Sequence, residues 1–497
     1  MKAMKLNFTS IIISAFVLMG LIMGSCKKLD TYPITSYSEN NFWKHPNHAS
    51  AALNGAYTLL QTALNTEFVY YGEARADLLK LHLENNTQSI NVINNRLDVN
   101  MAFADWGNFY AVIQQCNLIL KHVPLMLEKN IFQSTSTSSL NEYNRIMGQA
   151  HALRALCYFY MIRIWGEVPL ITEPVEVVED INTLKTPRTP MADIDTQIIK
   201  DLGKAREFLN TFTSYSDTKL TRSQLTRGAV DAIFTDFYLW IGDVANAITY
   251  ANNLVNSSGN PVSTVYAYTE LTGTTAALRY TSEYAQMFYS GYAKESIFEI
   301  AFNMDENSTS SLFGIYGGTG QAQFEASNIA LTKIGTADPR RDVVFNTGST
   351  KRFVQKFFEK DGSFDRTTMN DKNVIIYRLA DICLLKAEAL IKRGATNDRQ
   401  NALTLLNRIK QRAGVGQLGS TDFLAMTSEE ALTEVLEERA RELCFEGKRW
   451  FDLVRNNRAI VTMQPINGLS DARNVLWPIN LRIIRQNPTI QQNEYYK

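Results

Sequence analysis

The 497-residue sequence is poor in the residues that build disulfide frameworks and zinc sites, with five cysteines and five histidines. Only His45 and His48 lie close together, and Pro46 between them interrupts the helix that would aim both at one metal. The cysteines after the first show no CxxC spacing. We therefore expect no metal and no cofactor, and we expect buried free thiols at Cys116, Cys157, Cys383 and Cys444.

Neither sign of charge predominates, because 50 lysines and arginines balance 50 aspartates and glutamates. This balance argues against nucleic acid as a partner, since phosphate binding needs a basic surplus. The G-x-S-x-G, P-loop and H-E-x-x-H motifs are absent, and the glycines between Gly314 and Gly320 lack the Lys-Ser/Thr end of a phosphate loop. We therefore predict that the protein is not an enzyme.

The apolar run at residues 11–22 is too short for a comfortable membrane span and follows the basic residues Lys2 and Lys5, as in a secretory signal. It ends in Gly24-Ser25-Cys26, and small residues before a cysteine are typical of lipoprotein processing. We predict a signal peptide at residues 1–25, lipidation of Cys26 and a tether at residues 26–40. The alternative is an ordinary signal peptide with an incidental cysteine.

Apolar residues at helical spacing predict a mostly α-helical protein built from tetratricopeptide-like helix pairs. One pair spans residues 223–256, turns at Gly242 and restarts at Asp243. Another spans residues 374–412, turns at Gly394 and restarts at Asp398. We assign residues 41–256 to an N-terminal helical region and residues 374–497 to a C-terminal region.

Between these regions, at residues 257–373, the helical periodicity fails and Gly, Ser, Thr, Asn and Tyr accumulate. Phe298, Ile300 and Phe302 alternate as in a short strand. We predict an irregular, loop-rich inserted capping subdomain with a little β structure, because a loop of this length is usually functional or disordered and its aromatic content argues against disorder. A second irregular stretch covers residues 81–104.

The segment at residues 438–455, ERARELCFEGKRWFDLVR, is predicted as one charged helix that begins at a Thr427–Glu430 capping box. Glu438 and Glu442 would repel each other on this helix unless arginines separate them. We expect that role to fall to Arg439, Arg441 and Arg449. The combination of charges with Trp450 predicts a structural role: we expect this segment to lock neighbouring helices together through ion pairs and packing, and not to form a reacting centre.

This segment resembles the signature helix of the SusD/RagB family of nutrient-binding lipoproteins. The resemblance covers nearly the whole mature chain, in order, through NFW at 41–43, ALNGAY at 52–57, LRA at 153–155, GEVPL at 166–170, DPR at 338–340, YRLAD at 377–381, NRIKQRAG at 407–414 and WPI at 477–479.

The resemblance implies an outer-membrane lipoprotein, exposed at the cell surface, that binds oligomeric nutrients without catalysis. The nutrients are most often glycans, and the implied partner is a SusC-like TonB-dependent transporter. Two alternatives stay open: a peptide-binding member of the same family, and a tetratricopeptide-like scaffold for protein–protein contacts.

Sugar binding favours aromatic faces against C–H groups, with polar side chains holding the hydroxyls. The irregular stretches supply both kinds of residue. We therefore predict ligand-binding side chains at Arg75, Asp77, Asn94 and Asn95 near the first stretch, and at Tyr284, Tyr289, Tyr316 and Phe324 in the second. The alternative for each is packing or solvation, and Arg75 with Asp77 could equally form a structural ion pair.

Overall fold

A computed structural model describes residues 42–497, except 134–136, 177–179, 181, 183–184, 272–281, 307, 318–321, 346–351 and 359–370. The predicted signal peptide, Cys26 and the tether at residues 26–40 lie outside the described residues. Among the helices that the structure describes, none combines the length and apolar character needed to cross a membrane.

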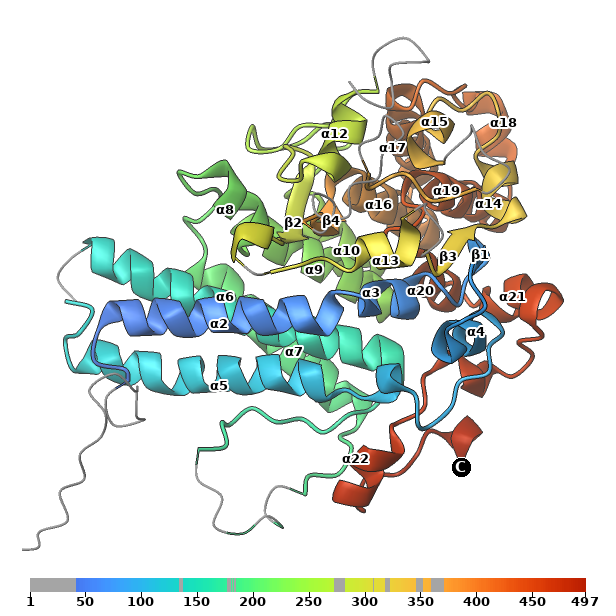
Figure 1. Ribbon diagram of the computed structural model, residues 1–497. Helices are drawn as coiled ribbons and strands as arrows, with labels where there is room; N and C mark the ends of the chain where they lie inside the picture. The colour runs from blue at the N-terminus through green and yellow to red at the C-terminus, as the bar shows by residue number, and fades with distance from the viewer. Residues whose placement is uncertain are drawn as a thin grey trace, which may run out of the picture.

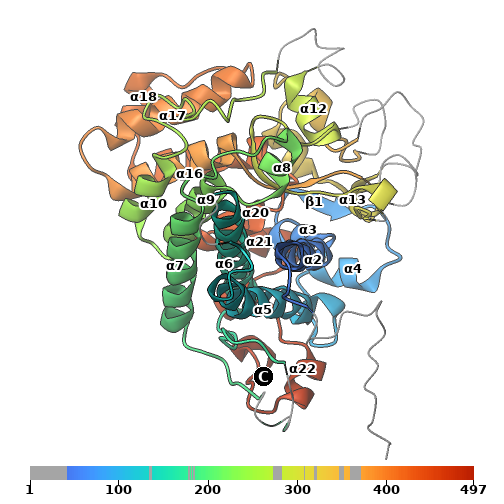
Figure 2. The ribbon, with the colours of Figure 1, turned by 90° about the vertical axis from the view of Figure 1, so that its left-hand side faces the viewer.

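Four long helices form the first half of the body, each packed on the next in sequence: α2 (Pro46–Leu64), α5 (Gly107–Glu128), α6 (Thr137–Trp165) and α7 (Met191–Phe208). α2, α5 and α6 run side by side in Figure 1, and Figure 2 shows these three from their ends, with α7 seen from its side next to α6. Alanines at the crossings, such as Ala56 and Ala150, are fully buried and let the backbones approach closely. The predicted mostly α-helical fold is therefore confirmed.

The series continues through two helix pairs: α9 (Arg227–Trp240) with α10 (Val244–Ala251), and α16 (Leu379–Arg393) with α17 (Asp398–Arg412). Gly242 turns the first pair at φ 83°, and the Asp243 side chain accepts from the Asn246 backbone N–H to begin α10. Gly394 ends α16 in the left-handed conformation at φ 65°. Both predicted turns are confirmed.

The sequence predicts residues 374–378 as the start of the second helix pair, but they form a strand, β4 (Val374–Arg378). This strand pairs antiparallel with β2 (Ser296–Ile300), and both strands are buried along their whole length. The β-branched residues Val374, Ile375 and Ile376 suit a pleated, buried surface better than a helix. A second two-stranded sheet joins β1 (Leu79–Leu81) to β3 (Phe324–Ala326).

Short helices fill the rest of the chain. Those before α9 are α3 (Glu67–Gly72), α4 (Thr87–Ile93), η1 (Ala102–Ala104) and α8 (Thr218–Ser223). Those of the inserted region are α12 (Glu283–Tyr289), η3 (Met304–Glu306), α13 (Leu312–Tyr316), α14 (Asn328–Lys333) and α15 (Arg341–Val344). Those after α17 are α18 (Ser420–Ala425), α19 (Ser428–Glu442), α20 (Arg449–Arg455), α21 (Ala459–Asn467), η4 (Ala472–Val475), α22 (Leu481–Gln486) and η5 (Glu494–Tyr496).

The signature segment forms two helices, α19 and α20, where the sequence predicted one. The capping box of Thr427 and Glu430 is confirmed at the start of α19. The helix ends because Phe445 (φ 67°) and Gly447 (φ 70°) take left-handed conformations. This break lets the Gly447 carbonyl approach α3 so closely that a Cβ on Gly72 would lie 1.9 Å from its oxygen.

A buried ionic lattice surrounds α19, and its arginines differ from most of those expected. Arg340 bridges Glu438 and Glu442 with Nη1 at 2.7 and 2.9 Å, while Arg378 and Arg412 also bind Glu442. Burial alone would raise the pKa of Glu442, but these guanidinium groups hold it well below its usual value.

Of the three arginines expected to separate Glu438 from Glu442, only Arg441 contacts either of them, with Nε 2.9 Å from Glu438. Arg439 instead binds Asp381 and Asp452, and Arg449 binds Asp77. The lattice therefore joins α19 to segments far away in sequence, and its structural role as a lock is confirmed.

The four cysteines after the first are buried free thiols, as predicted. Cys116 lies on α5 and Cys157 on α6, both within the helical core. Burial raises the pKa of the Cys116 thiol to about 12, so this group stays protonated and unreactive at neutral pH.

Candidate functional site

The four aromatic residues predicted to contact a ligand lie in the core instead. Tyr284, Tyr316 and Phe324 are fully buried, and Tyr289 is nearly so. The Tyr316 ring stacks on Phe357 at 5.7 Å, and the Tyr284 hydroxyl donates to the Glu442 carbonyl at 3.3 Å. The expectation of exposed aromatic faces is therefore corrected: Tyr284 and Tyr316 pack the insertion against the signature segment, and Phe324 packs edge-on against Tyr70.

Arg75 is fully buried and acts as a connector. Its Nη1 donates to the Val475 carbonyl at 2.7 Å, and its Nη2 donates to the Asn95 side chain at 2.7 Å. The guanidinium also lies 4.2 Å from the centre of the Trp450 ring. Burial lowers the pKa of Arg75 to about 10. These contacts hold the C-terminal segment against the first irregular stretch and leave the guanidinium away from solvent.

Asp77 pairs with Arg449, not with Arg75, so the alternative of an Arg75–Asp77 ion pair is corrected. Arg449 Nε and Nη2 lie 2.8 and 3.0 Å from the two carboxylate oxygens of Asp77. Asn94 donates from its side chain to the Ile90 carbonyl at 2.9 Å and ends α4. Asn94 and Asn95 are only half-buried, so ligand binding by these two side chains stays a prediction.

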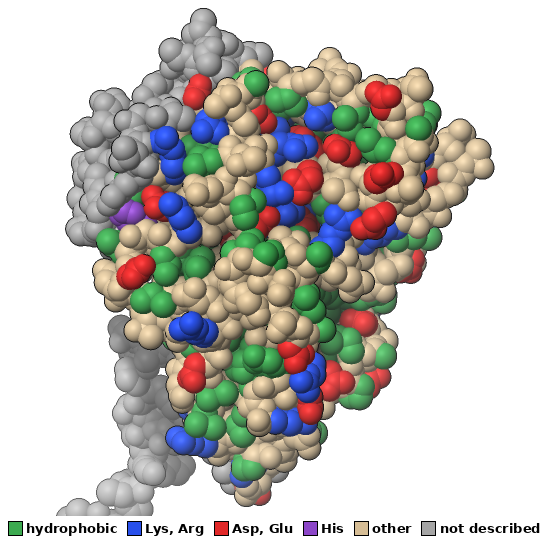
Figure 3. Space-filling model, turned by 90° about the vertical axis from the view of Figure 1, so that its right-hand side faces the viewer, with side chains coloured by type: hydrophobic (Ala, Val, Ile, Leu, Met, Phe, Trp, Pro, Cys, Tyr) green, Lys and Arg blue, Asp and Glu red, His purple; other side chains and the backbone are tan. Residues whose placement is uncertain are grey.

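The two irregular stretches meet in space through the β1–β3 ladder. The His82 backbone N–H donates to the Gln323 carbonyl at 2.9 Å and extends that ladder. Lys80 on β1 forms an ion pair with Glu325 on β3 at 3.1 Å. The side of the molecule that carries these strands in Figure 1 faces the viewer in Figure 3, where acidic and basic side chains are interspersed.

An open polar groove, which we call the α2 groove, lies between the C-terminal half of α2 and the segment of residues 301–306 and 308–309. Its volume is about 520 Å³, and it is lined by Thr58, Gln61, Thr62, Asn65, Thr66, Glu67, Phe302, Glu306, Ser308 and Thr309. A smaller cavity of about 290 Å³ adjoins it and shares Gln61 and Glu306. None of the eight predicted ligand-binding residues lines either cavity.

Two amide side chains of α2 hold the loop that forms the opposite wall. Gln61 donates from Nε2 to the Ala301 carbonyl. Asn65 donates to the Thr309 carbonyl at 3.0 Å and accepts from the Ser311 backbone N–H at 2.7 Å. The groove is therefore a built feature of the contact between the helical body and the insertion.

Hydroxyl, amide and carboxylate side chains line the groove, and no lysine or arginine is among them. The hydroxyls of Thr58 and Thr62 donate to carbonyls one helical turn earlier, so their lone pairs remain available. The Glu306 carboxylate forms no ion pair within the described part of the chain. Burial raises the pKa of Glu67 at one end of the groove.

One signal for this groove is present in the sequence, although it does not identify the groove by itself. The polar residues Asn54, Thr58, Gln61, Thr62 and Asn65 recur at helical spacing on the side of α2 opposite its buried stripe. A polar stripe on a helix normally means a solvated face, so only the position of the distant residues 301–306 and 308–309 distinguishes it as a groove wall.

A body of stacked helix pairs with a loop-rich insertion and open polar grooves defines a helical binding scaffold. Comparison with known protein families identifies the class of this scaffold more closely. The SusD family model matches residues 238–496, and a model described as "Starch-binding associating with outer membrane" matches residues 29–239. The chain belongs to the SusD family.

Named relatives match the chain over different lengths. SusD-like protein P38 of Formosa agariphila is 27% identical over 99% of this chain and 100% of its own length. Starch-binding protein SusD of Bacteroides thetaiotaomicron is 30% identical over 28% of this chain and 25% of its own length. Among solved structures, a laminarin-binding SusD-like protein shares the fold with a TM-score of 0.73 and 21% identity, covering 91% of this chain and 100% of its own.

Proposed function

We propose that this protein binds a neutral oligosaccharide in the α2 groove and passes it on without chemical change. The observation that carries the proposal is an open groove of about 520 Å³ lined by hydroxyl, amide and carboxylate side chains, with no lysine or arginine among the lining residues. Sugar hydroxyls can donate to the carboxylate, amide and threonine oxygens of this surface and can accept from its hydroxyl groups.

The shape of the groove suits an oligomer better than a single sugar. The lining residues from Asn54 to Thr62 follow α2, and those from Asn65 to Glu67 continue the groove to the start of α3. At about 1.5 Å of rise per residue the part along α2 alone is about 12 Å long. Phe302 supplies an apolar edge on the loop side, against which the C–H face of a sugar ring can pack.

The family supports a glycan as the nutrient. One relative is named as a starch-binding protein, and one structural neighbour is named as laminarin-binding. Both glycans are uncharged, which agrees with a groove whose ionisable groups, Glu67 and Glu306, are acidic. The carboxylates serve here as hydroxyl acceptors and disfavour anionic glycans.

Calorimetry of the full chain against malto- and laminari-oligosaccharides tests the site. Glu306→Gln and Gln61→Ala should each weaken binding about three- to tenfold, because one hydrogen bond contributes roughly 0.5–1.5 kcal/mol. Glu207→Gln, which alters an exposed carboxylate on α7, is the matched control and should leave the affinity unchanged. Binding that survives both groove variants would contradict the assignment of the site.

The same titrations distinguish the remaining functions. Release of shorter sugars from any glycan, followed by chromatography, would favour an enzyme. Binding confined to peptides would keep the scaffold and replace the ligand class. Retention of the protein by other surface proteins, with no small ligand bound, would favour the scaffold function.

Delivery to a SusC-like TonB-dependent transporter in the outer membrane completes the proposal. The N-terminal family match supports an outer-membrane location, and Cys26 would carry the lipid that holds the protein at the cell surface. The described chain begins against the ends of α2 and α5, where Trp43 stacks on His122 at 4.9 Å. A tether that joins the body there would leave the rest of the protein free to swing as a lid.

Crosslinking in intact cells, followed by gentle detergent extraction, tests this partner. We expect a large outer-membrane β-barrel to be recovered with the protein through an interface larger than about 1,000 Å². Repeated recovery of the protein alone would contradict the lid arrangement and leave a free-standing binding protein.

A further inference from the structure

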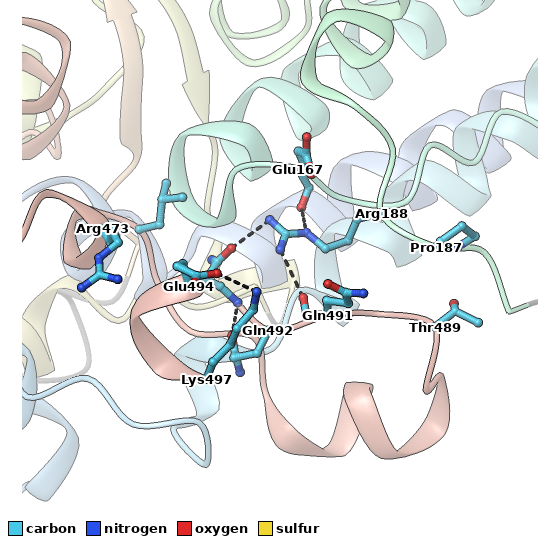
Figure 4. Close-up of a pocket in the computed structure, with 11 residues that line it drawn as sticks. Glu167, Pro187, Arg188, Arg473, Thr489, Gln491, Gln492, Glu494 and Lys497 are labelled. Atoms are coloured by element: carbon cyan, nitrogen blue, oxygen red, sulfur yellow. Dashed lines mark hydrogen bonds and ion pairs between the residues drawn. The ribbon is translucent and has the colours of Figure 1, made fainter.

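A second polar cavity, which we call the C-terminal pocket, lies on a different part of the molecule from the α2 groove. Its volume is about 530 Å³, and the turn after α6, residues 187–188 and the chain around η4 and η5 form its walls. Figure 4 shows Arg188 at its centre, with Gln491, Glu494 and Lys497 contributed by the C-terminal segment.

Arg188 is held rigidly by neutral acceptors. Its Nε donates to the Glu167 carbonyl at 2.7 Å, and its Nη1 donates to the Gln491 carbonyl at 3.1 Å. Its Nη2 donates to the Trp165 carbonyl at 3.3 Å and to Asn493 Oδ1 at 2.8 Å. Burial lowers the pKa of Arg188, which is the expected effect of removing a cation from water without a paired anion.

This guanidinium has no carboxylate partner within the described residues. A guanidinium has five N–H donors, and the four contacts leave one hydrogen of Nη1 without an acceptor in the described chain. The Glu167 contact is through the backbone, so the carboxylate of that exposed residue does not neutralise Arg188 directly. The pocket therefore contains a fixed, partly desolvated positive charge and a spare donor.

Two further cations stand at the rim in exposed ion pairs. Arg473 binds Asp471, and Lys497 binds Glu494, with about half of each cationic side chain open to solvent. Exposed pairs of this kind contribute little to stability, because solvent screens the two charges. Either cation can therefore turn toward an anion in the pocket at small energetic cost.

We infer that the C-terminal pocket is a second ligand site that takes a carboxylated sugar unit, such as a uronic acid residue of a glycan. The carboxylate would meet Arg188 and the rim cations, while Gln491 and Thr489 would contact the sugar hydroxyls. The inference rests on the proposed function only in that the ligand is a glycan. It adds recognition of acidic units at a place separate from the α2 groove.

Titration calorimetry with tetragalacturonate, and with the same oligomer fully methyl-esterified, tests the inference on the full chain. We expect the acid to bind at least about tenfold more tightly than the ester, as one charge-assisted contact of roughly 1.5–3 kcal/mol allows. Raising the salt concentration should weaken binding of the acid and leave the ester unchanged.

Variants test whether the preference for the acid over the ester arises in the C-terminal pocket. Arg188→Gln should remove the preference for the acid, and the double variant Arg473→Gln/Lys497→Gln should reduce it about threefold or more. The double variant keeps the test decisive where Arg188→Gln fails to fold, because both rim side chains are exposed. Lys204→Gln is the matched control, since Lys204 forms an equally exposed pair with Glu207 on α7.

Equal affinity for acid and ester, or a preference for the acid that survives in every folded variant, would overturn the inference. Titration of neutral oligosaccharides in parallel measures binding to the α2 groove independently of the C-terminal pocket. If neutral oligosaccharides do not bind but the acid is still preferred over the ester, only the assignment of the α2 groove is refuted. If neutral oligosaccharides bind but the acid is not preferred, only the assignment of the C-terminal pocket is refuted.

Discussion

Replacing Arg449 with methionine should destabilise the protein strongly, because it strands a buried carboxylate. Arg449 and Asp77 make two hydrogen bonds of 2.8 and 3.0 Å, and their side chains are only 4% and 2% exposed. Breaking such a pair by removing one partner typically costs about 3–5 kcal/mol. Domains are stable by only about 5–15 kcal/mol, so this single change should remove a large share of the total. Methionine retains most of the arginine stem, which confines the effect to the lost charge.

Urea unfolding followed by circular dichroism measures the effect in a double-mutant cycle. The single variants Arg449→Met and Asp77→Asn should each lose stability, while the double variant should lose less than their sum because it leaves no charge unpaired. Lys204→Met, in an exposed pair on α7, should change the free energy of unfolding by no more than about 0.5 kcal/mol. Additive losses in the double variant, or an Arg449→Met loss no larger than that of Lys204→Met, would refute the reasoning.

Three further predictions concern other parts of the chain. Cys26→Ala should move the protein from the detergent phase to the aqueous phase in phase partitioning; unchanged partitioning would show that another group anchors it. Burial raises the pKa of Glu73 from 4.5 to about 8, so the folded state keeps a proton that the unfolded state releases. Stability should therefore fall as pH rises from about 4.5 to 8, and Glu73→Gln should flatten that slope in urea titrations at several pH values; an identical slope in the variant would count against it. Gly72→Ala should lower the melting temperature sharply because its Cβ would collide with the Gly447 carbonyl, whereas Gly203→Ala, with open space around it, should be neutral or stabilising; equal effects would contradict the close approach.

Several local features could be predicted because their causes lie within a few residues. The capping box at Thr427, the turn at Gly242 with Asp243 after it, and the left-handed Gly394 all follow from the preferences of single residues. The break at Phe445 could not be predicted in this way, although Gly447 two residues later is a local stop signal. Phe445 itself is left-handed at φ 67°, and its backbone N–H donates to the distant Glu73 carboxylate at 2.9 Å, a contact that the sequence pattern does not show.

The predicted ligand-binding residues show the same division. Tyr284 and Tyr316 lie in a region without periodicity, so their sequence context could not show that they are buried. Gln61 contacts Ala301 across 240 residues of sequence, and the α2 groove depends on this contact and on those of Asn65 with Thr309 and Ser311. A side chain's type is local information, whereas its exposure depends on which distant segment packs over it.

By itself the sequence determined the helical class, the positions of the helix pairs, the buried thiols and the resemblance to the SusD/RagB family, since apolar spacing and capping residues act within one or two helical turns. Only the tertiary structure decided which arginines neutralise Glu442, which polar stripe borders a groove and which aromatic rings are buried. The physical reason is that burial and charge pairing are energies of contact between distant segments. Local preferences set the elements, and the long-range contacts among them place the sites.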